Sequence, residues 1–274
     1  MQWRVLASTV LLACSTGAPR DLSNATLGEA SFRVPQNLYA VREVTPSPFV
    51  ASVLAQSDRA AADRALDTRK QAADLLTFVA VRPGMHVAEL GCGDGYFTEL
   101  LARAVGPGGI VFAQNSAAVM SPAALDAWRT RLARPAMANV SSYDGAFAHP
   151  LPPEARDLDL VYLGVHYGLL TRAGADRDGM NHAVHLALAP GGRYVVMDWA
   201  LPSEVQESGV EAHRQQSRST RREIESAGFD FVSEGRFLRT SPYPDDWDAI
   251  PGTEREPLPR EHKADVFVLV FVKP

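Results

Sequence analysis

The sequence predicts an α/β fold in which helices cover both faces of a mostly parallel sheet. After residue 49, short apolar runs alternate with helical patterns, as in consecutive βαβ units. The first of these units contains a glycine-rich turn, Gly91-Cys92-Gly93-Asp94-Gly95, between a strand and a helix. The chain has 274 residues, 46% of them hydrophobic, which is enough for one complete core of this kind.

Most of the predicted strands are short, largely apolar runs next to turn residues. The seven runs are 87–90, 110–113, 138–142, 158–163, 193–197, 229–232 and 266–272. The fourth run is apolar almost throughout, as expected for a strand that is covered on both faces. The fifth follows the turn Pro190-Gly191-Gly192.

Each predicted helix has apolar residues at helical spacing between breakers. The helices are 58–79, 96–105, 121–133, 181–188 and 219–227. Alanine and leucine favour the first helix by propensity, and Pro83-Gly84 follows its end. Gly228 stops the last helix. Seven strands with crossover helices fit the length of the chain.

The first residues predict export from the cytoplasm. Residues 1–13 have the pattern of a signal peptide, with Arg4 before an apolar run that is too short to span a bilayer. The apolar run closes on the tetrad Leu11-Leu12-Ala13-Cys14, which resembles the lipobox of bacterial lipoproteins. This resemblance implies a lipid anchor at Cys14 and a place in the cell envelope. An ordinary secretory signal, giving a periplasmic protein, and a cytoplasmic protein with an apolar start are the alternatives.

The domain organisation follows from this start. Residues 14–48 are rich in Ser, Ala, Pro and Asn and predict a tether, and residues 49–274 form the domain. With two cysteines, Cys14 and Cys92, we expect no disulfide framework. The net charge of -5 and the lack of a long basic run argue against nucleic acid as a partner.

The glycine turn is suited to hold a nucleotide cofactor. Residues without a Cβ let the backbone approach a ligand, and the start of the following helix offers free N–H donors and a partial positive charge. Asn115 ends the second strand about twenty residues on, where a Rossmann-like domain contacts a ribose. A tight turn without a ligand is the alternative for this motif.

Several segments resemble one family. Residues 87–96 resemble motif I of the class I S-adenosylmethionine-dependent methyltransferases, and residues 189–196 resemble that family's Pro-Gly-Gly turn into the fifth strand. Residues 265–274 and 63–70 are similar to a bacterial subgroup of predicted methyltransferases, here with a lipoprotein-like start. The resemblance covers residues 55–274. It implies a Rossmann-like, seven-stranded sheet with an antiparallel last strand, and S-adenosylmethionine as the cofactor.

The resemblance also implies a set of cofactor contacts. Glu89 would position the cofactor's ammonium group, the turn would border its methionine part, Asn115 would meet the ribose hydroxyls, and Asp144-Gly145 would lie beside the adenine. The implied cofactor residues are Glu89, Gly91, Cys92, Gly93, Gly95, Asn115, Asp144, Gly145, Leu163 and Val165. Asn115 departs from the family's usual Asp or Glu. Because an amide lacks the charge of a carboxylate, we expect cofactor affinity to be weaker by about 1 to 2 kcal/mol.

Candidate chemical groups follow the strands, because ligands in such sheets lie beyond the strands' carboxyl ends. Methyl transfer needs in-line positioning and a base for a protic acceptor. His166 is the candidate base, with a pocket wall as its alternative role, and Asp198 either orients the substrate or pairs with an arginine. Tyr167 is a candidate for substrate binding or for packing. We expect no metal site, because His182 and His185 lack a further ligand at suitable spacing.

A long Pro-rich, aromatic segment, residues 241–259, precedes the last strand, and its Tyr243 and Trp247 are expected to cover the substrate side of the cleft.

The predicted function is methyl transfer from S-adenosylmethionine to a small-molecule acceptor. Export would place the protein where that cofactor is not expected, so the alternative is a non-catalytic or repurposed module that binds a nucleoside or another small ligand at the cell envelope. A NAD-linked oxidoreductase shares the turn, but the pattern from Glu89 to Gly95 disfavours it.

Overall fold

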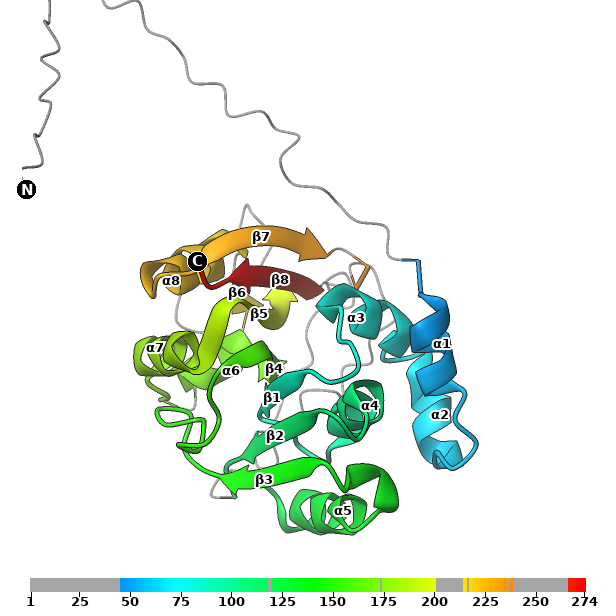
Figure 1. Ribbon diagram of the computed structural model, residues 1–274. Coiled ribbons are helices and arrows are strands. Elements are labelled where there is room, and N and C mark those ends of the chain that lie inside the picture. The colour runs from blue at the N-terminus through cyan, green and yellow to red at the C-terminus, as the bar shows by residue number, and fades with distance from the viewer. Residues whose placement is uncertain are drawn as a thin grey trace, which may run out of the picture. The chain divides into compact units, whose positions relative to one another are not determined.

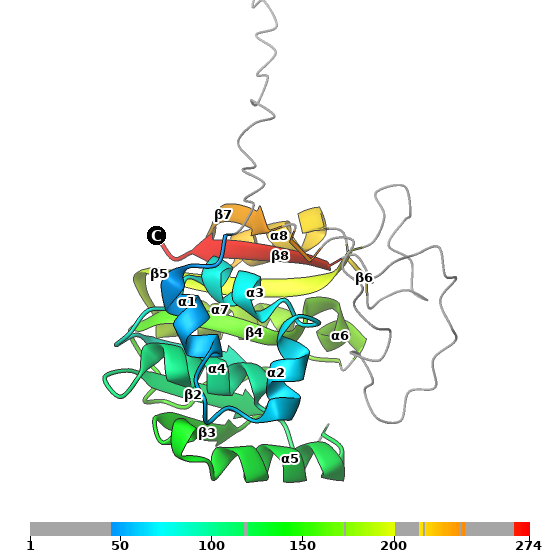
Figure 2. The ribbon, with the colours of Figure 1, turned by 90° about the vertical axis from the view of Figure 1, so that its right-hand side faces the viewer.

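The structure is a computed structural model that describes residues 45–117, 120–172, 174–200, 214–215, 217–235, 237–238 and 266–274. The predicted signal peptide, Cys14 and nearly all of the predicted tether lie outside these residues, as do Tyr243 and Trp247. The described residues form one sheet with helices on both faces (Figures 1 and 2). Within this described part, no helix is both long and apolar enough to cross a membrane.

The sheet has the predicted strands. They are β1 (His86–Leu90), β2 (Ile110–Asn115), β3 (Val140–Asp144), β4 (Leu158–His166), β5 (Leu188–Ala200), β7 (Asp230–Gly235) and β8 (Val266–Val272), with the two-residue β6 (Arg214–Gln215) beside β5. Their order is β3-β2-β1-β4-β5-β8-β7. All pairs are parallel except those that β8 makes with β5 and β7, so the predicted antiparallel last strand is confirmed.

The chain reverses its direction of travel across the sheet at β1. From β1 it continues to β2 and β3 on one side, and then crosses to β4 on the other side. In open α/β sheets, ligands bind at such a switch point, beyond the carboxyl ends of the strands. The glycine turn, which directly follows β1, therefore lies where a ligand is expected.

The helices are α1 (Pro48–Leu54), α2 (Ala61–Asp67), α3 (Ala72–Val79), α4 (Tyr96–Val105), α5 (Pro122–Leu132), the 3₁₀ helix η2 (Pro135–Met137), α6 (Tyr167–Arg172), α7 (Arg177–Ala187) and α8 (Ser217–Ser226). The helices α1, α3 and α4 cover one face of the sheet, and α6, α7 and α8 cover the other (Figure 1). Along β1, Val87 joins the first core and Ala88 and Leu90 join the second. Because side chains alternate along a strand, Glu89 faces α3 and α4.

One predicted helix is wrong in its extent. Residues 58–79 were expected to form a single helix, but α2 and α3 are separated by a turn at 68–71, in which Gln71 has a left-handed φ of 44°. The helix α3 buries Leu75 and Leu76 in the core, whereas α2 is held outside it by ion pairs of Asp63 and Asp67. Tertiary contacts thus override the alanine-rich propensity.

The helices α1 and α6 were not predicted. Ser47 caps α1 by accepting a hydrogen bond from the Val50 N–H at 3.2 Å, and Pro48 opens the helix. The helix α6 follows β4 without a loop, and Asp198 Oδ2 accepts a hydrogen bond from the Gly168 N–H in its first turn, at 2.8 Å. Neither helix has a long periodic pattern, so both depend on these local caps.

Candidate functional site

The glycine turn has the backbone that its sequence predicts. Gly91, Gly93 and Gly95 have φ values of 70°, 58° and 79°, a region that strongly favours glycine. A Cβ on Gly95 would lie 2.5 Å from Cζ3 of Trp128, so this glycine lets α4 and α5 pack. No described atom lies within 4 Å of a Cβ placed on Gly93. The turn is therefore closed by packing at Gly95 and open to a ligand at Gly93.

Asn115 closes the turn from the neighbouring strand. Its Oδ1 accepts a hydrogen bond from the Gly93 N–H at 2.9 Å, and its Nδ2 donates to the Gly93 carbonyl at 3.0 Å. A carboxylate could make only the first of these bonds, which accounts for the amide at a position where an acid is usual. The amide nitrogen and oxygen each keep capacity for one more hydrogen bond, so the ribose contact stays a prediction.

The amide of Asn115 predicts a measurable dependence of stability on residue type. In Asn115→Asp, a carboxylate oxygen would face the Gly93 carbonyl, so we expect the free energy of unfolding to fall by about 1 to 3 kcal/mol in urea unfolding near neutral pH. The control is Asp144→Asn, because an amide oxygen there still accepts the bond from the Ala117 N–H; its change should stay within about 0.5 kcal/mol. Equal stability of Asn115→Asp and wild type would show that the amide is not needed.

The ends of β2 and β3 lie side by side at the same sheet edge. The Gly145 N–H donates to the Asn115 carbonyl at 3.0 Å, and Gln114 Nε2 donates to the Gly145 carbonyl at 2.5 Å. Asp144 is exposed at the end of β3, in register with Asn115. The structure thus brings together the residues predicted to lie along the ribose and the adenine. On the other side of β1, Leu163 is fully buried in β4, and Val165 is described by its backbone alone.

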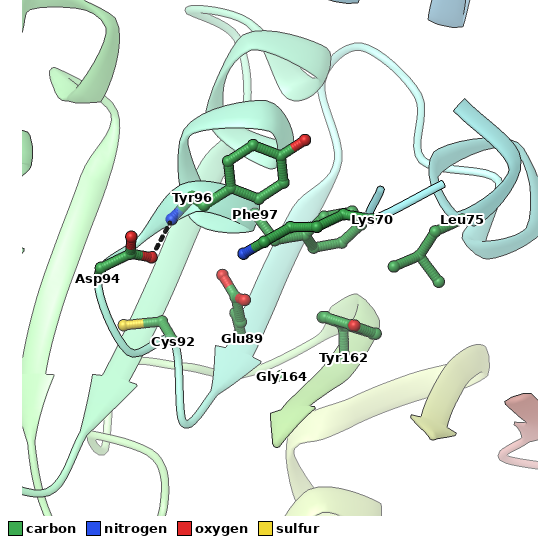
Figure 3. A pocket seen from close by; sticks show the side chains of 9 residues that line it. All are labelled: Lys70, Leu75, Glu89, Cys92, Asp94, Tyr96, Phe97, Tyr162 and Gly164. Atoms are coloured by element: carbon green, nitrogen blue, oxygen red, sulfur yellow. Dashed lines mark hydrogen bonds between the residues drawn. The ribbon is translucent and has the colours of Figure 1, made fainter. Parts of the chain in front are cut away.

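A small cavity of about 60 Å³ lies beside the turn (Figure 3). It is lined by Lys70, Leu75, Glu89, Cys92, Asp94, Tyr96, Phe97, Tyr162 and Gly164. This volume holds about four water molecules, so the cavity suits a small polar group and not a whole nucleoside. Glu89 and Cys92 were among the predicted cofactor residues, whereas the Lys70 and Tyr162 contributions were missed.

Glu89 is the buried acid of this cavity, with 2% of its surface exposed. Its Oε2 accepts a hydrogen bond from the Thr98 hydroxyl at 2.6 Å. Burial raises the pKa of Glu89 to about 8, with the Asp94 charge adding to the rise, and the Thr98 bond and the Lys70 charge opposing it. Near neutral pH the carboxyl therefore holds a proton that a cationic group entering the cavity would displace.

Lys70 enters the same cavity from the turn between α2 and α3. Its ammonium points toward Glu89 and lies 4.3 Å from the centroid of the Tyr96 ring, a cation–π contact (Figure 3). Burial lowers the pKa of Lys70, while the nearby Asp94 and Glu89 charges oppose that shift. The similarity of residues 63–70 to the bacterial subgroup was the one sequence signal in this region, and it did not indicate which side chain faces the cavity.

Buried ion pairs hold α2 against the turn and α5. Arg131 donates to both carboxylate oxygens of Asp63, at 2.7 and 2.9 Å, and to Glu99 at 2.8 Å. Its Nε donates to the Asp94 carbonyl at 2.8 Å, which ties the glycine turn into the same cluster. The hydrogen bonds from Arg131 lower the pKa of Asp63 to about 2. This cluster fixes the helix that leads to Lys70.

A second contact fixes the end of α2. Asp67 accepts hydrogen bonds from both terminal nitrogens of Arg59, at 2.6 and 2.7 Å, and from the Tyr96 hydroxyl at 2.6 Å. Since Tyr96 opens α4, this contact sets the distance between α2 and the glycine turn. Lys70 follows Asp67 by three residues, so the contacts of Asp63 and of Asp67 both fix the segment that leads to Lys70.

The candidate chemical groups lie farther along the sheet edge. His166 ends β4 with its backbone paired to Met197, and its side chain lies outside the described atoms. Asp198 is fully buried, and besides its bond to Gly168 its Oδ1 accepts from the Trp199 N–H at 2.8 Å. Through these contacts Asp198 positions the start of α6, so its role toward a substrate stays a prediction.

The structure places Tyr167 in the core and not along the cavity. The side chain is fully buried, its hydroxyl donates to Glu223 at 2.8 Å, and it accepts from Asn181 Nδ2 at the same distance. These partners lie on α8 and α7. Of the two roles considered for Tyr167, packing is the one that these contacts favour, because α6 begins at this residue and turns it into the core.

Comparisons with known proteins find one matching family model and many similar folds. Residues 22–146, somewhat under half of the chain, match the family model of protein-L-isoaspartate(D-aspartate) O-methyltransferase. A putative sarcosine dimethylglycine methyltransferase from Galdieria sulphuraria superposes with a TM-score of 0.54 at 14% identity, over 86% of this chain and 94% of that one. A SAM-dependent methyltransferase from Aquifex aeolicus superposes with a TM-score of 0.52 at 14% identity, over 82% and 98%. The chain therefore has the fold of the class I S-adenosylmethionine-dependent methyltransferases, and its N-terminal half matches one of their family models.

A further solved structure has the same fold. The glycopeptide N-methyltransferase MtfA superposes with a TM-score of 0.51 at 20% identity, over 77% of this chain and 98% of that one. No curated protein matches the sequence. The structural neighbours share the fold at low identity, and their names describe different acceptors, so they indicate no particular acceptor for this protein.

The residues of this site fit the cofactor of proteins with this fold, S-adenosylmethionine. Glu89 is a buried acid that a cationic amino group would ionise, and the open space over Gly93 admits a ligand close to the backbone. The edge formed by Asn115 and Asp144 continues from the turn. A cofactor whose nucleoside lay along this edge could therefore place its amino acid group in the cavity. Asn115 fits a ribose contact only in part, because its side chain already makes two hydrogen bonds with the Gly93 backbone.

Proposed function

We propose that this protein moves a methyl group from S-adenosylmethionine to a small-molecule acceptor. The observation that carries the proposal is the buried Glu89 carboxyl beneath a glycine turn that is open at Gly93. When bound, S-adenosylmethionine supplies an electrophilic methyl group on a sulfonium. The residues of the chain bind and orient: the turn lies against the cofactor, Glu89 holds its ammonium group, and the strand ends fix its direction.

Acceptor activation is assigned to the end of β4. We propose that His166 takes the proton of a protic acceptor, since it lies at the carboxyl end of the strand next to β1. Asp198 supports this edge by holding the Gly168 N–H, and so fixes α6 directly after His166. Tyr243 and Trp247 are proposed to cover the substrate side. A small acceptor agrees with a net charge of -5, which does not favour a nucleic acid.

A second candidate function is a binding module without transfer activity, at the cell envelope. The signal-peptide pattern of residues 1–13 and the lipobox-like Cys14 support that location, where S-adenosylmethionine is not expected. The engagement of Asn115 by Gly93 also favours it, because the position that usually contacts the ribose is partly used by the turn. The ligand would be another nucleoside or a small molecule of similar shape.

Titration calorimetry of the full chain separates these functions. We expect S-adenosylmethionine and S-adenosylhomocysteine to bind, and NAD not to bind. Failure of both sulfur nucleosides to bind below about 1 mM would overturn the methyltransferase proposal. Methyl-labelled S-adenosylmethionine with a bacterial extract then tests transfer: label in the small-molecule fraction supports the enzyme, and binding without labelled product supports the binding module.

Substitution of Gly93 tests the position of the cofactor. Gly93→Val fills the open space with a branched side chain, and we expect affinity for S-adenosylhomocysteine to fall by at least about 100-fold in calorimetry. The matched control is Gly84→Val at the amino end of β1, where φ is 81° and no described atom lies within 4 Å of a Cβ. Both variants carry similar backbone strain. Unchanged affinity in a folded Gly93→Val protein would remove the ligand from the turn.

A further inference from the structure

The cavity beside the turn holds a second charged group that the proposed function does not use. Lys70 and Glu89 reach it from different segments, the turn after α2 and the strand β1, and their ammonium and carboxyl ends point toward one another (Figure 3). Leu75, Phe97 and Tyr162 form apolar walls around them. The site thus presents one acid and one cation within a small cavity whose walls are partly apolar.

This pair of charges complements a zwitterion. An acid alone would select an amine, and a cation alone would select a carboxylate. An α-amino acid group carries both charges on one carbon atom, so it can meet Glu89 with its ammonium and Lys70 with its carboxylate. Charge-assisted hydrogen bonds of this kind are strong where water is excluded.

We propose that Lys70 binds the carboxylate of the amino acid end of the cofactor, so that Lys70 and Glu89 together recognise the zwitterion. The inference rests on the proposed function, because it assigns a role within the same site. It makes Lys70 a specificity-determining residue that comes from the helices before β1, outside the glycine motif.

The chain holds Lys70 firmly in this position. The turn at 68–71 ends at Gln71, whose φ of 44° is unfavourable for a residue with a Cβ. On its N-terminal side, Asp63 and Asp67 anchor α2 through Arg131, Arg59 and Tyr96. On its C-terminal side, α3 is buried in the core. A strained turn between two fixed helices is the arrangement expected where a side chain must be placed.

The same geometry allows an opposite effect of Lys70. If the ammonium of Lys70 occupied the position that the cofactor's own ammonium needs beside Glu89, Lys70 would compete with the cofactor, and its removal would strengthen binding. The proposed contact of Lys70 with the cofactor's carboxylate, here called the clamp, predicts weaker binding when Lys70 is replaced. Competition by Lys70 predicts tighter binding.

The test compares two ligands that differ by the carboxylate alone. They are S-adenosylhomocysteine and 5′-deoxy-5′-(3-aminopropylthio)adenosine, which keeps the nucleoside, the thioether and the amine. In calorimetry of the full chain, we expect wild type to bind the second ligand about 10- to 100-fold more weakly. In Lys70→Met, S-adenosylhomocysteine should lose the same factor, and the difference between the ligands should vanish. Lys70→Arg should restore part of it.

The control variant changes a positive charge that lies away from the cavity. Arg82→Met removes a positive charge from an exposed loop and should leave the preference for the carboxylate unchanged. Equal affinity of wild type for the two ligands would overturn the clamp without any variant, and so would tighter binding by Lys70→Met or an equal loss for both ligands. If wild type binds neither ligand, the proposed function itself fails. If wild type binds both ligands equally well, the proposed function stands and only the clamp fails.

Discussion

Replacement of Arg131 by methionine is expected to lower the free energy of unfolding by about 3 to 5 kcal/mol. The Arg131 side chain is 7% exposed and is bonded to Asp63 and Glu99, whose side chains are equally buried. Without the guanidinium, Asp63 would keep only Arg134, which is one-third exposed and shared with Glu99, while Glu99 would also keep its buried pair with Arg103. The buried carboxylate of Asp63 would then be poorly compensated, which is the source of the large effect.

Urea unfolding at neutral pH measures this change, and Arg129→Met is the matched control. Arg129 lies on the same helix, but its side chain is 73% exposed and its ion pair with Asp126 is exposed too, so the control should change stability by less than about 1 kcal/mol. A loss in Arg131→Met no larger than in the control would show that the cluster does not stabilise the fold.

The pH dependence of this variant gives an independent check. Because the pKa of Asp63 in the folded protein lies at about 2, below its ordinary value of 3.8, its ion pair contributes stability above pH 3.8 that is lost as the pH falls toward 2. The contribution is about 2 kcal/mol for a shift of this size. In Arg131→Met this part of the acid dependence should be smaller in unfolding curves recorded between about pH 5 and about pH 2, because Arg134 alone then lowers the pKa of Asp63.

Cofactor affinity is expected to rise about 20-fold between about pH 6 and about pH 7.5. Burial raises the pKa of Glu89 to about 8, so the carboxyl is mostly protonated over this range in the free protein. The cofactor's ammonium binds the ionised form, and the fraction of protein in that form grows as the pH rises toward the pKa. Binding must therefore release a proton, close to one per site at about pH 6.5.

Calorimetry in buffers of different ionisation enthalpy measures the released proton, and Glu89→Gln is the control. The glutamine amide oxygen still accepts from the Thr98 hydroxyl, so the fold should be retained while the pH dependence disappears and binding weakens. An affinity of wild type that is constant over this range, with no proton released, would show that Glu89 does not meet the cofactor's ammonium.

The parts of the fold that were predicted from the sequence have local signals. The helix 96–105 agrees with α4 at both ends, because the glycine turn and Gly106 bound it, and most of the strands contain a short apolar run next to turn residues. The break between α2 and α3 has no such signal. It depends on the pairing of Asp63 with Arg131, which is 68 residues away in the chain, so alanine propensity alone predicted one long helix.

The candidate site divides in the same way. The glycine turn and Glu89 were predicted because they form one contiguous motif. Lys70 and Tyr162 lie in other segments, and their meeting with Glu89 follows from the sheet order and from the anchors of α2. For Tyr167, its position after β4 indicated the cleft, but its side chain belongs to the opposite core, since the start of α6 decides its direction.

The amide bridge between Asn115 and Gly93 bears on the kinetics of this site. The bridge gives the turn its shape through contacts within the chain, so the loop is already ordered when a ligand arrives. A preorganised loop loses little conformational entropy on association and needs no slow rearrangement. The rate at which a nucleoside enters should then be governed by diffusion to the sheet edge, and differences in affinity among its ligands should appear mainly as differences in residence time.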